Sequence, residues 1–414
     1  MMNAPTDRGG GPPLRPDGRR GALALALVLV AAPLWAQERD LAVEYTGPAG
    51  SSKPFLTAGP DGDLLLSWLE PVGDGSWALK VVTRHRGQWL EPRTVLQHDR
   101  FFVNWADFPS VVETSNGAWL AHWLEKTEAK PYAYHVMVSS SSDRGASWSP
   151  PRTAHADRSP TEHGFVAMVP GSTGSVSLAW LDGGQMTDEG GAMALRSATW
   201  LPNGTLSQET VVDARTCECC QVSMARGGNG LVVAYRDRSD DEIRDIAVAR
   251  ELGGRWTRPV IVHRDGFATR ACPVNGPAID ASGHEVVVAW FTAANGELRV
   301  KAAFSHDGGA SFDRPLRIDL GNTVGRVQTR MIGPGAALVV WLEATADGAE
   351  WMARRVTSTG SVGRPTTLGR TSRSRDAGFP RSVVEGGQLY TAWSEPGQGG
   401  RVLVTRLPVQ SLDR

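Results

Sequence analysis

The chain has 414 residues and a formal net charge of −1, from 43 Lys and Arg against 44 Asp and Glu. This balance excludes a protein that coats nucleic acid or anionic lipid, because both partners require a basic surface. Hydrophobic residues make up 41% of the chain, which is therefore not disordered and can bury a large core. The 47 glycines and 26 prolines favour an all-β fold, since turn residues recur wherever strands are short.

The first 36 residues have the pattern of an export signal. Arg15, Arg19 and Arg20 precede an apolar stretch, residues 22–35, which is shorter than the roughly 20 residues that span a bilayer. A basic start, a short apolar stretch and the small residue Ala36 are typical of a secretory signal peptide. We therefore expect a signal peptide at 1–36, a single mature domain at 37–414, a periplasmic or secreted location and no membrane span after cleavage. An uncleaved membrane anchor is the alternative.

A repeat organises the rest of the chain. Each copy has a turn, usually with glycine, then four or five apolar residues, an aromatic residue and, two places on, usually an acid. Successive aromatic residues are 51 to 57 positions apart, close to the length of a four-stranded propeller blade. The pattern predicts a seven-bladed β-propeller, with a six-bladed sialidase-type ring as the alternative. The seven aromatic anchors are Trp68, Trp123, Trp180, Tyr235, Trp290, Trp341 and Trp393.

Each repeat divides into an inner strand, the anchor strand and two further strands. The seventh copy ends before its fourth strand, and residues 41–45 are expected to supply it. This N-terminal strand would close the ring and remove edges that invite aggregation. The expected inner strands are residues 54–59, 109–114, 165–170, 221–226, 276–281, 328–333 and 380–385.

Two turns between third and fourth strands share the motif S-x-D-x-G-x-x-[W/F]. The aspartate can accept N–H bonds in the turn, the glycine can adopt positive φ, and the aromatic residue can pack on the blade. With these turns the chain resembles the Asp-box (BNR-repeat) proteins of the sialidase superfamily. The resemblance implies a β-propeller in which the turns are structural. The motif residues are Ser141, Asp143, Gly145 and Trp148 in one copy and Ser305, Asp307, Gly309 and Phe312 in the other.

The resemblance also implies an active site with three arginines that clamp a carboxylate, a tyrosine with a glutamate partner, and an aspartate. Where the family has its first arginine, this chain has Lys53 before Pro54. Tyr132 and Tyr134 are candidates for the tyrosine. The sequence leaves open whether the protein is an enzyme; if it is, a sialidase-like glycoside hydrolase is expected. The other catalytic candidates are Arg236, Asp237, Arg330 and Arg381.

All four cysteines are expected at one mouth of the channel, because they precede the inner strands of repeats 4 and 5. In an exported protein they favour disulfides, here closing a loop of about 50 residues. A copper or zinc site built from the sulfur atoms is one alternative, and a redox-active Cys219–Cys220 pair is another. No cofactor is otherwise expected. The four residues are Cys217, Cys219, Cys220 and Cys272.

A loop rich in arginine and aspartate lies at the same expected mouth. Its guanidinium groups can hold a carboxylate or phosphate in bidentate fashion, with the aspartates fixing their geometry. A solvated, salt-bridged turn is the alternative interpretation. The candidate ligand-binding residues are Arg236, Asp237, Arg238, Arg244, Asp245 and Asn275.

An acidic residue usually stands two places beyond the anchor. Such a rim can attract cations or polyhydroxyl ligands, but the carboxylates can equally accept hydrogen bonds from their own blades. Several histidines recur near fourth strands, and His163 lies where it could join a metal site. The residues beyond the anchors are Glu70, Glu125, Asp182, Asp237, Thr292, Glu343 and Glu395.

Together these features predict an exported, sialidase-like propeller that binds a ligand on the repeat 4–5 side of its channel mouth. The ligand is expected to be a small molecule or carbohydrate, with no nucleic-acid partner and a monomeric protein. An exo-sialidase-type glycoside hydrolase is the first alternative function. A soft-metal or redox protein built on the cysteine cluster is the second.

Overall fold

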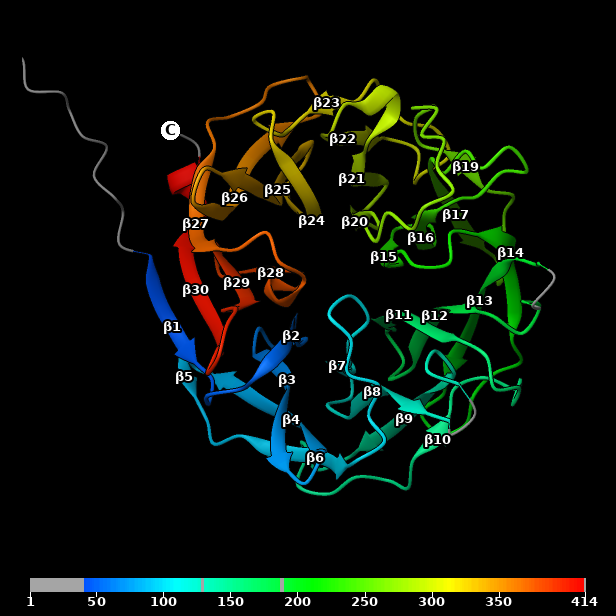
Figure 1. Ribbon diagram of the computed structural model, residues 1–414, viewed down its shortest axis with the longest axis vertical. Coiled ribbons are helices and arrows are strands. Elements are labelled where there is room, and N and C mark those ends of the chain that lie inside the picture. The colour runs from blue at the N-terminus through cyan, green and yellow to red at the C-terminus, as the bar shows by residue number, and fades with distance from the viewer. Residues whose placement is uncertain (1–40, 128–129, 187–189, 413–414) are drawn as a thin grey trace, which may run out of the picture. The chain divides into compact units, whose positions relative to one another are not determined.

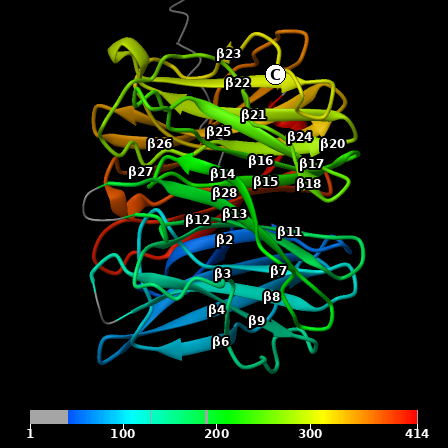
Figure 2. The ribbon, with the colours of Figure 1, turned by 90° about the vertical axis from the view of Figure 1, so that its right-hand side faces the viewer.

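Seven antiparallel sheets surround a central channel in the computed structural model, which describes residues 41–127, 130–186 and 190–412 (Figure 1). The all-β class and the count of seven blades are confirmed. From the side, the strands run from one face of the ring toward the other (Figure 2). The predicted signal peptide lies outside the described residues. Within those residues, no helix is both long and apolar enough to cross a membrane.

The blades follow one another along the chain, each starting at the channel. Blade 1 contains β2 (Ser52–Ala58), β3 (Leu64–Gly73), β4 (Ser76–His85), β5 (Gln88–Trp89) and β6 (Arg93–His98). Blade 2 contains β7 (Ser110–Glu113), β8 (Trp119–Lys126), β9 (Tyr134–Ser141) and β10 (Arg152–Thr153). Blade 3 contains β11 (His163–Pro170), β12 (Val176–Asp182), β13 (Met193–Trp200) and β14 (Thr210–Thr216).

The next two blades carry most of the candidate ligand-binding residues. Blade 4 contains β15 (Ser223–Gly227), β16 (Gly230–Arg236), β17 (Ile246–Leu252), β18 (Arg255–Trp256) and β19 (Val260–Ile261). Blade 5 contains β20 (Ala278–Ser282), β21 (Glu285–Thr292), β22 (Arg299–Ser305) and β23 (Leu316–Arg317), with the 3₁₀ turn η1 (Ala294–Gly296) between β21 and β22.

The last two blades complete the ring. Blade 6 contains β24 (Thr323–Gly333), β25 (Ala336–Thr345), β26 (Gly348–Thr357) and β27 (Thr366–Thr371). Blade 7 contains β28 (Arg381–Glu385), β29 (Gln388–Ser394) and β30 (Val402–Pro408), flanked by the 3₁₀ turns η2 (Arg375–Ala377) and η3 (Val409–Leu412).

Strand β1 (Ala42–Thr46) closes the ring, as the sequence predicted. It pairs antiparallel with β30, placing Ala42 opposite Arg406 and Thr46 opposite Leu403. The sheet order β1-β30-β29-β28 thus joins the start of the domain to its end (Figure 1). The pairing covers the edge of β30 that would otherwise be free to bind another chain.

The second strand of each blade, which carries the aromatic anchor, is buried on both faces because neighbouring blades stack on it. Every residue of β12 is buried, and all seven aromatic anchors have an exposed fraction of 3% or less. Their continuous apolar runs fit a sheet covered on both sides. The hydrophobic core therefore lies between blades and is distributed around the ring.

The turn after β9 forms the hydrogen bonds that its sequence suggested. Ser141 Oγ donates to Asp143 Oδ1 at 2.8 Å, and the Gly145 N–H donates to Ser141 Oγ at 2.7 Å. Gly145 has φ of 80°, and a Cβ there would lie 2.8 Å from the Trp119 ring. The turn after β22 repeats these bonds with Ser305, Asp307 and Gly309. Both turns are thus built from their own side chains.

Acidic residues at the ends of several second strands hydrogen-bond the anchors. The Trp68 indole N–H donates to Glu70 Oε2 at 2.8 Å, and that of Trp341 donates to Glu343 Oε2 at 2.7 Å. In blade 4 the anchor Tyr235 donates instead to Asp213. These carboxylates therefore have the structural role that was the alternative to a ligand-attracting rim.

Candidate functional site

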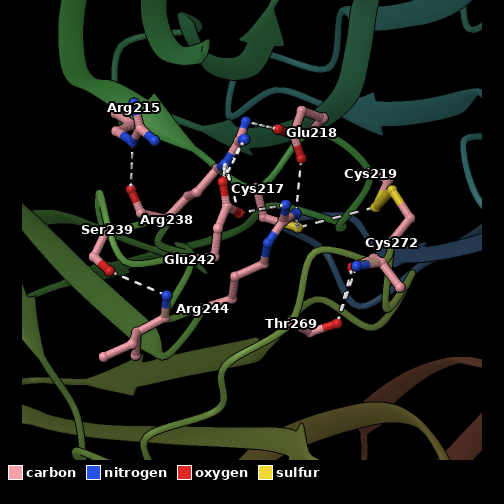
Figure 3. Close-up of polar contacts among 12 residues, drawn as sticks. Arg215, Cys217, Glu218, Cys219, Arg238, Ser239, Glu242, Arg244, Thr269 and Cys272 are labelled. Carbon is pink, nitrogen blue, oxygen red and sulfur yellow. Dashed lines mark hydrogen bonds and ion pairs between the residues drawn. A yellow bond between two sulfur atoms is a disulfide. The ribbon is translucent and has the colours of Figure 1, made fainter. Parts of the chain in front are cut away.

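The inner strands begin, and the second strands end, on one face of the ring, which we call the mouth. The segment before β15 carries Cys217, Cys219 and Cys220, and the segment before β20 carries Cys272. Cys219 and Cys272 form a disulfide that ties blade 4 to blade 5 (Figure 3). The disulfide interpretation is therefore confirmed for two of the four cysteines, which do gather at one mouth.

The other two cysteines are buried free thiols. Cys217 Sγ lies 3.1 Å from Cys220 Sγ and 3.9 Å from Cys219 Sγ. The two thiols thus have C-x-x-C spacing, which is visible in the sequence but was not among the predicted pairs. The predicted redox pair Cys219–Cys220 is wrong, because Cys219 is bonded to Cys272.

Cys217 is surrounded by groups that favour its thiolate. A hydrogen bond from the Cys220 thiol, the Arg236 charge and a 3.3 Å contact from Arg244 Nη1 lower the pKa of Cys217 to about 6. Burial has the opposite effect on Cys220 and raises its pKa well above the ordinary value. The surroundings therefore favour the thiolate at Cys217 and the protonated thiol at Cys220.

Arg238 and Arg244 are paired with two glutamates beside the cysteines (Figure 3). Arg244 donates to Glu218 Oε2 at 2.7 Å and to Glu242 Oε2 at 3.0 Å. Arg238 donates to Glu242 Oε1 at 2.7 Å and also pairs with Glu218. The two guanidinium groups are thus neutralised within the protein, as in the salt-bridged alternative. Sequence reasoning missed the role of Glu218, although it stands between two cysteines.

Arg236 is placed differently from the predicted ligand clamp. Its side chain is buried, and its guanidinium donates to the main-chain carbonyls of Asn275, Arg244 and Phe291 at 2.7–3.1 Å. These carbonyls lie on three segments of blades 4 and 5. Arg236 therefore joins the two blades, and the donors in these bonds are used by main-chain carbonyls.

The remaining predicted ligand-binding residues also support the loops. Asp245 accepts the N–H groups of Gly266 and Phe267 at 3.1 and 3.0 Å. Asn275 Oδ1 accepts the Arg326 N–H at 2.7 Å and so links blades 5 and 6. Burial raises the pKa of Asp237 to about 6. This carboxyl therefore changes charge near neutrality.

The catalytic candidates Arg330 and Arg381 both stand on inner strands at the channel. The Arg381 guanidinium lies 4.7 Å from the centre of the Phe55 ring and 4.4 Å from that of Phe108. Burial, and secondarily Arg330, lower its pKa to about 9. These two arginines approach each other, but Arg236 does not join them, so the three do not form one clamp.

A loop between β6 and β7 crosses the mouth (cyan, Figure 1). Its Trp105 ring stacks on Phe379 of the segment before β28, with centroids 5.8 Å apart, and contacts Arg326. The Ala106 carbonyl accepts a bond from Gln221 at 2.8 Å. One loop thus contacts blades 4, 6 and 7 and covers the centre of the channel.

Asp107 of this loop meets a tyrosine and a glutamate from blades 2 and 3. Tyr134 OH donates to Glu162 Oε1 at 2.6 Å, and Asp107 Oδ2 accepts the Phe165 N–H at 2.8 Å. Burial raises the pKa of Asp107 to about 8 and also raises the pKa of Glu162. Of the two candidate tyrosines, Tyr134 therefore has a glutamate partner, whereas Tyr132 is 66% exposed.

A polar cavity of about 400 Å³ lies at the mouth between blades 7 and 1. Lys53 contributes to it from a left-handed bulge in β2, with φ of 58°. Burial lowers the pKa of Lys53, and Asp376 opposes that shift. Among the described residues, the Lys53 ammonium has no hydrogen-bond or ion-pair partner. The other polar side chains around the cavity are Ser51, Ser52, Asp376, Ser394, Glu395 and Gln398.

Three groups of described side chains have the spacing of metal ligands: two contain histidines, and the third is Cys217, Cys219 and Cys220. Ligand atoms of His135, His155 and His163 lie within 4.8 Å of one another, as do those of Asp157, His163 and Asp182. His163 Nδ1 is 3.2 Å from Asp182 Oδ2, and both nitrogens of His155 already bond main-chain atoms. At the cysteines, the disulfide leaves only two thiols, beside two guanidinium groups. The structure thus contains candidate ligands without evidence of a cofactor.

Comparison with known proteins supports the fold. No protein-family model and no curated protein matches the chain. Polysaccharide lyase Uly1 is similar over 92% of this chain and 94% of its own, with a TM-score of 0.52 and 8% identity. The α-L-arabinanase of Penicillium chrysogenum, determined with arabinobiose, matches over 89% and 98%, with a TM-score of 0.51 and 11% identity.

A microbial sialidase, Hz136, matches over 70% of this chain and 63% of its own, with a TM-score of 0.42 and 16% identity. By fold, the protein is a seven-bladed β-propeller, as its repeats indicated. The structures that it resembles include enzymes that act on saccharides.

Proposed function

We propose that this protein is an exported sialidase-like propeller that binds a saccharide at its mouth, in the cavity around Lys53. One observation carries the proposal: a half-buried lysine without a partner among the described residues faces a polar cavity of about 400 Å³. Small-ligand sites are concave and contain a few placed polar groups that fix the orientation of the ligand, and this cavity offers such groups. The S-x-D-x-G turns, which we interpret as Asp-boxes, support the family resemblance.

We choose the Lys53 cavity because the charged side chains on the two sides of the mouth differ in whether the protein already pairs them. On the blade 4–5 side, Arg238 and Arg244 are neutralised by Glu218 and Glu242. A ligand there would have to displace these pairs. The Lys53 ammonium needs no such exchange and can donate to a hydroxyl or carboxylate oxygen, while the carboxylates around the cavity accept sugar hydroxyls. We therefore place the saccharide on the blade 7–1 side, opposite the predicted location.

Binding is tested with the mature chain, residues 37–414, on an array of acidic and neutral oligosaccharides, followed by calorimetry with the best ligand. We expect Lys53→Gln to weaken binding at least about tenfold, the effect of a lost charged hydrogen bond. The matched control is Lys80→Gln in the same blade, because Lys80 pairs with Glu70 and does not line the cavity. Equal affinities for both variants would exclude this cavity as the site.

A sialidase-type hydrolase is the second candidate function, favoured by the bond between Tyr134 and Glu162. In that case a fluorogenic sialic-acid substrate should be cleaved, and Tyr134→Phe should abolish turnover by removing the nucleophilic oxygen. Tyr132→Phe, at an exposed tyrosine two residues away, is the control. No turnover by the wild-type protein would leave the binding function alone.

A further inference from the structure

We propose that the four cysteines form a thiol–disulfide exchange centre, in which the Cys217–Cys220 dithiol transfers its hydrogen equivalents to the Cys219–Cys272 disulfide. This activity is separate from saccharide binding, because the cysteines lie on blades 4 and 5 and the Lys53 cavity lies between blades 7 and 1. The proposal rests on the positions of the sulfur atoms and of the side chains around them.

The sulfur atoms form a continuous path from the interior to the surface. Cys220 Sγ is 3.1 Å from Cys217 Sγ, which is 3.9 Å from Cys219 Sγ, the inner atom of the disulfide. Cys217 and Cys220 are buried, Cys219 is partly exposed, and Cys272 is exposed. A disulfide at this site can therefore move from an exposed position to a buried one by steps between neighbouring atoms.

The interior end of the path contains the nucleophile that exchange requires. Disulfide exchange proceeds by attack of a thiolate on a disulfide sulfur, and nearby guanidinium groups favour the thiolate. Arg244 Nη1 donates to Cys217 Sγ at 3.3 Å, and Arg236 adds a second positive charge. Arg244 is itself fixed by Glu218 and Glu242, so its contact with the sulfur is held in place.

The exchange needs no outside oxidant. In the first step the Cys217 thiolate attacks Cys219 Sγ; the Cys217–Cys219 bond forms, and Cys272 leaves as a thiolate that takes a proton from water. In the second step Cys220 loses its proton and attacks Cys217 Sγ, forming the Cys217–Cys220 disulfide and releasing the Cys219 thiolate. One disulfide and two thiols are present before and after, so atoms and electrons balance.

The products differ from the starting state in two ways. The covalent connection between blades 4 and 5 is broken, because the new disulfide lies within one segment. The Cys272 thiol becomes available on the surface, where it can attack a disulfide of a second molecule. The centre thus couples the redox state of the mouth to how firmly blades 4 and 5 are joined.

A metal site is the competing interpretation of the same residues. It would need thiolate ligands, but Cys219 is held in the disulfide, and the two remaining sulfurs lie beside the positive charges of Arg236 and Arg244. These charges stabilise an anion and repel a cation. The surroundings therefore favour exchange over metal binding.

The test follows the disulfide in the mature chain, residues 37–414, brought to one disulfide per molecule with a limiting amount of dithiothreitol. The protein is incubated with iodoacetamide and quenched with acid, and the alkylated and paired cysteines are assigned by peptide mass spectrometry. We expect Cys272 to be alkylated over time and the Cys217–Cys220 disulfide to appear. Cys220→Ser should instead accumulate the Cys217–Cys219 intermediate.

Two further comparisons separate exchange from direct reduction of the exposed disulfide. Cys217→Ser should keep Cys219–Cys272 intact and Cys272 unlabelled. Arg244→Gln should slow exchange on the order of tenfold by raising the thiol pKa, whereas Arg238→Gln, in the same ion network but without a sulfur contact, should change it less than about twofold. A wild-type protein in which Cys272 stays unlabelled and bonded to Cys219 would overturn the proposal, as would equal labelling of Cys272 in Cys217→Ser.

Discussion

Single carboxylates at the ends of second strands stabilise the ring through several bonds at once. Glu343 accepts the Trp341 indole N–H at 2.7 Å and the Asn322 N–H at 2.7 Å. We expect Glu343→Ala to lower the free energy of unfolding by about 2–3 kcal/mol, because buried donors lose their acceptor. Urea denaturation measures this change. The exposed Glu297→Ala, at a surface ion pair with Arg299, should change stability by less than about 1 kcal/mol.

Asp107 should make stability depend on pH. In the folded protein its pKa is raised to about 8, chiefly by burial, whereas the unfolded carboxyl titrates near 3.8. Between these values the folded state holds a proton that the unfolded state has released. Raising the pH through this interval therefore favours unfolding. Below about pH 4 Asp107 is protonated in both the folded and the unfolded state, so its ionisation no longer lowers the free energy of unfolding.

Asp107→Asn should remove this dependence while keeping an acceptor for the Phe165 N–H. At pH 8 the variant should be more stable than the wild type by on the order of 5 kcal/mol, and near pH 4 the two should be similar. Thermal or urea unfolding at several pH values provides the measurement. Parallel pH profiles for the two proteins would show that Asp107 does not keep its proton.

Sequence reasoning predicted the bonding partners of the individual site residues least well. The arginines of the 235–245 loop were expected to face a ligand, but Arg236 bonds backbone and Arg244 bonds glutamates and a thiol. Sequence spacing showed that these side chains would lie near the cysteines. It did not show which partner each would choose, because that depends on loops from two different blades.

At the scale of elements, strand β1 is the clearest example of a segment that stabilises the fold by closing the ring. Its Tyr45 ring lies 5.8 Å from the Trp68 ring and 4.9 Å from the Trp89 ring, so the strand also packs on blade 1. A chain beginning at residue 47 should melt at a lower temperature and aggregate, because the edge of β30 is exposed.

Calorimetry and size-exclusion chromatography would check this effect against a chain beginning at residue 41. An unchanged melting temperature with monomeric elution would show that the closure is dispensable. The sequence located this strand correctly, because the seventh repeat visibly lacked a fourth strand. It did not reveal the bulges in the inner strands, where Lys53 and Arg326 adopt φ of 58° and 56°.

These bulges determine which side chains of the inner strands face the mouth. A left-handed residue reverses the alternation of side chains along a strand, so the direction of Lys53 does not follow from counting residues in β2. Lys53 was noted in the sequence only as a departure from the arginine of the family. Lys53 lines a cavity only because blade 7 packs beside blade 1 in the closed ring.

At the scale of the whole molecule, the export that we propose would determine the redox chemistry available to the cysteines. We expect secretion to remove residues 1–36, so that the mature protein begins at Gln37; N-terminal sequencing of protein from the periplasm or medium checks this. Such a location permits disulfides to persist. Recovery of full-length protein in the membrane fraction would favour an uncleaved anchor instead.

The sequence by itself determined the repeat, the number of blades, the closing strand and the face on which the cysteines gather. These features follow from periodicity, because each blade buries the same kinds of residue at nearly the same spacing. Only the tertiary structure decided which cysteines pair, where each arginine donates and which cavity stays polar and open. Such choices depend on contacts between residues that are far apart in sequence, and side chains of one type can have many partners until the ring closes around them.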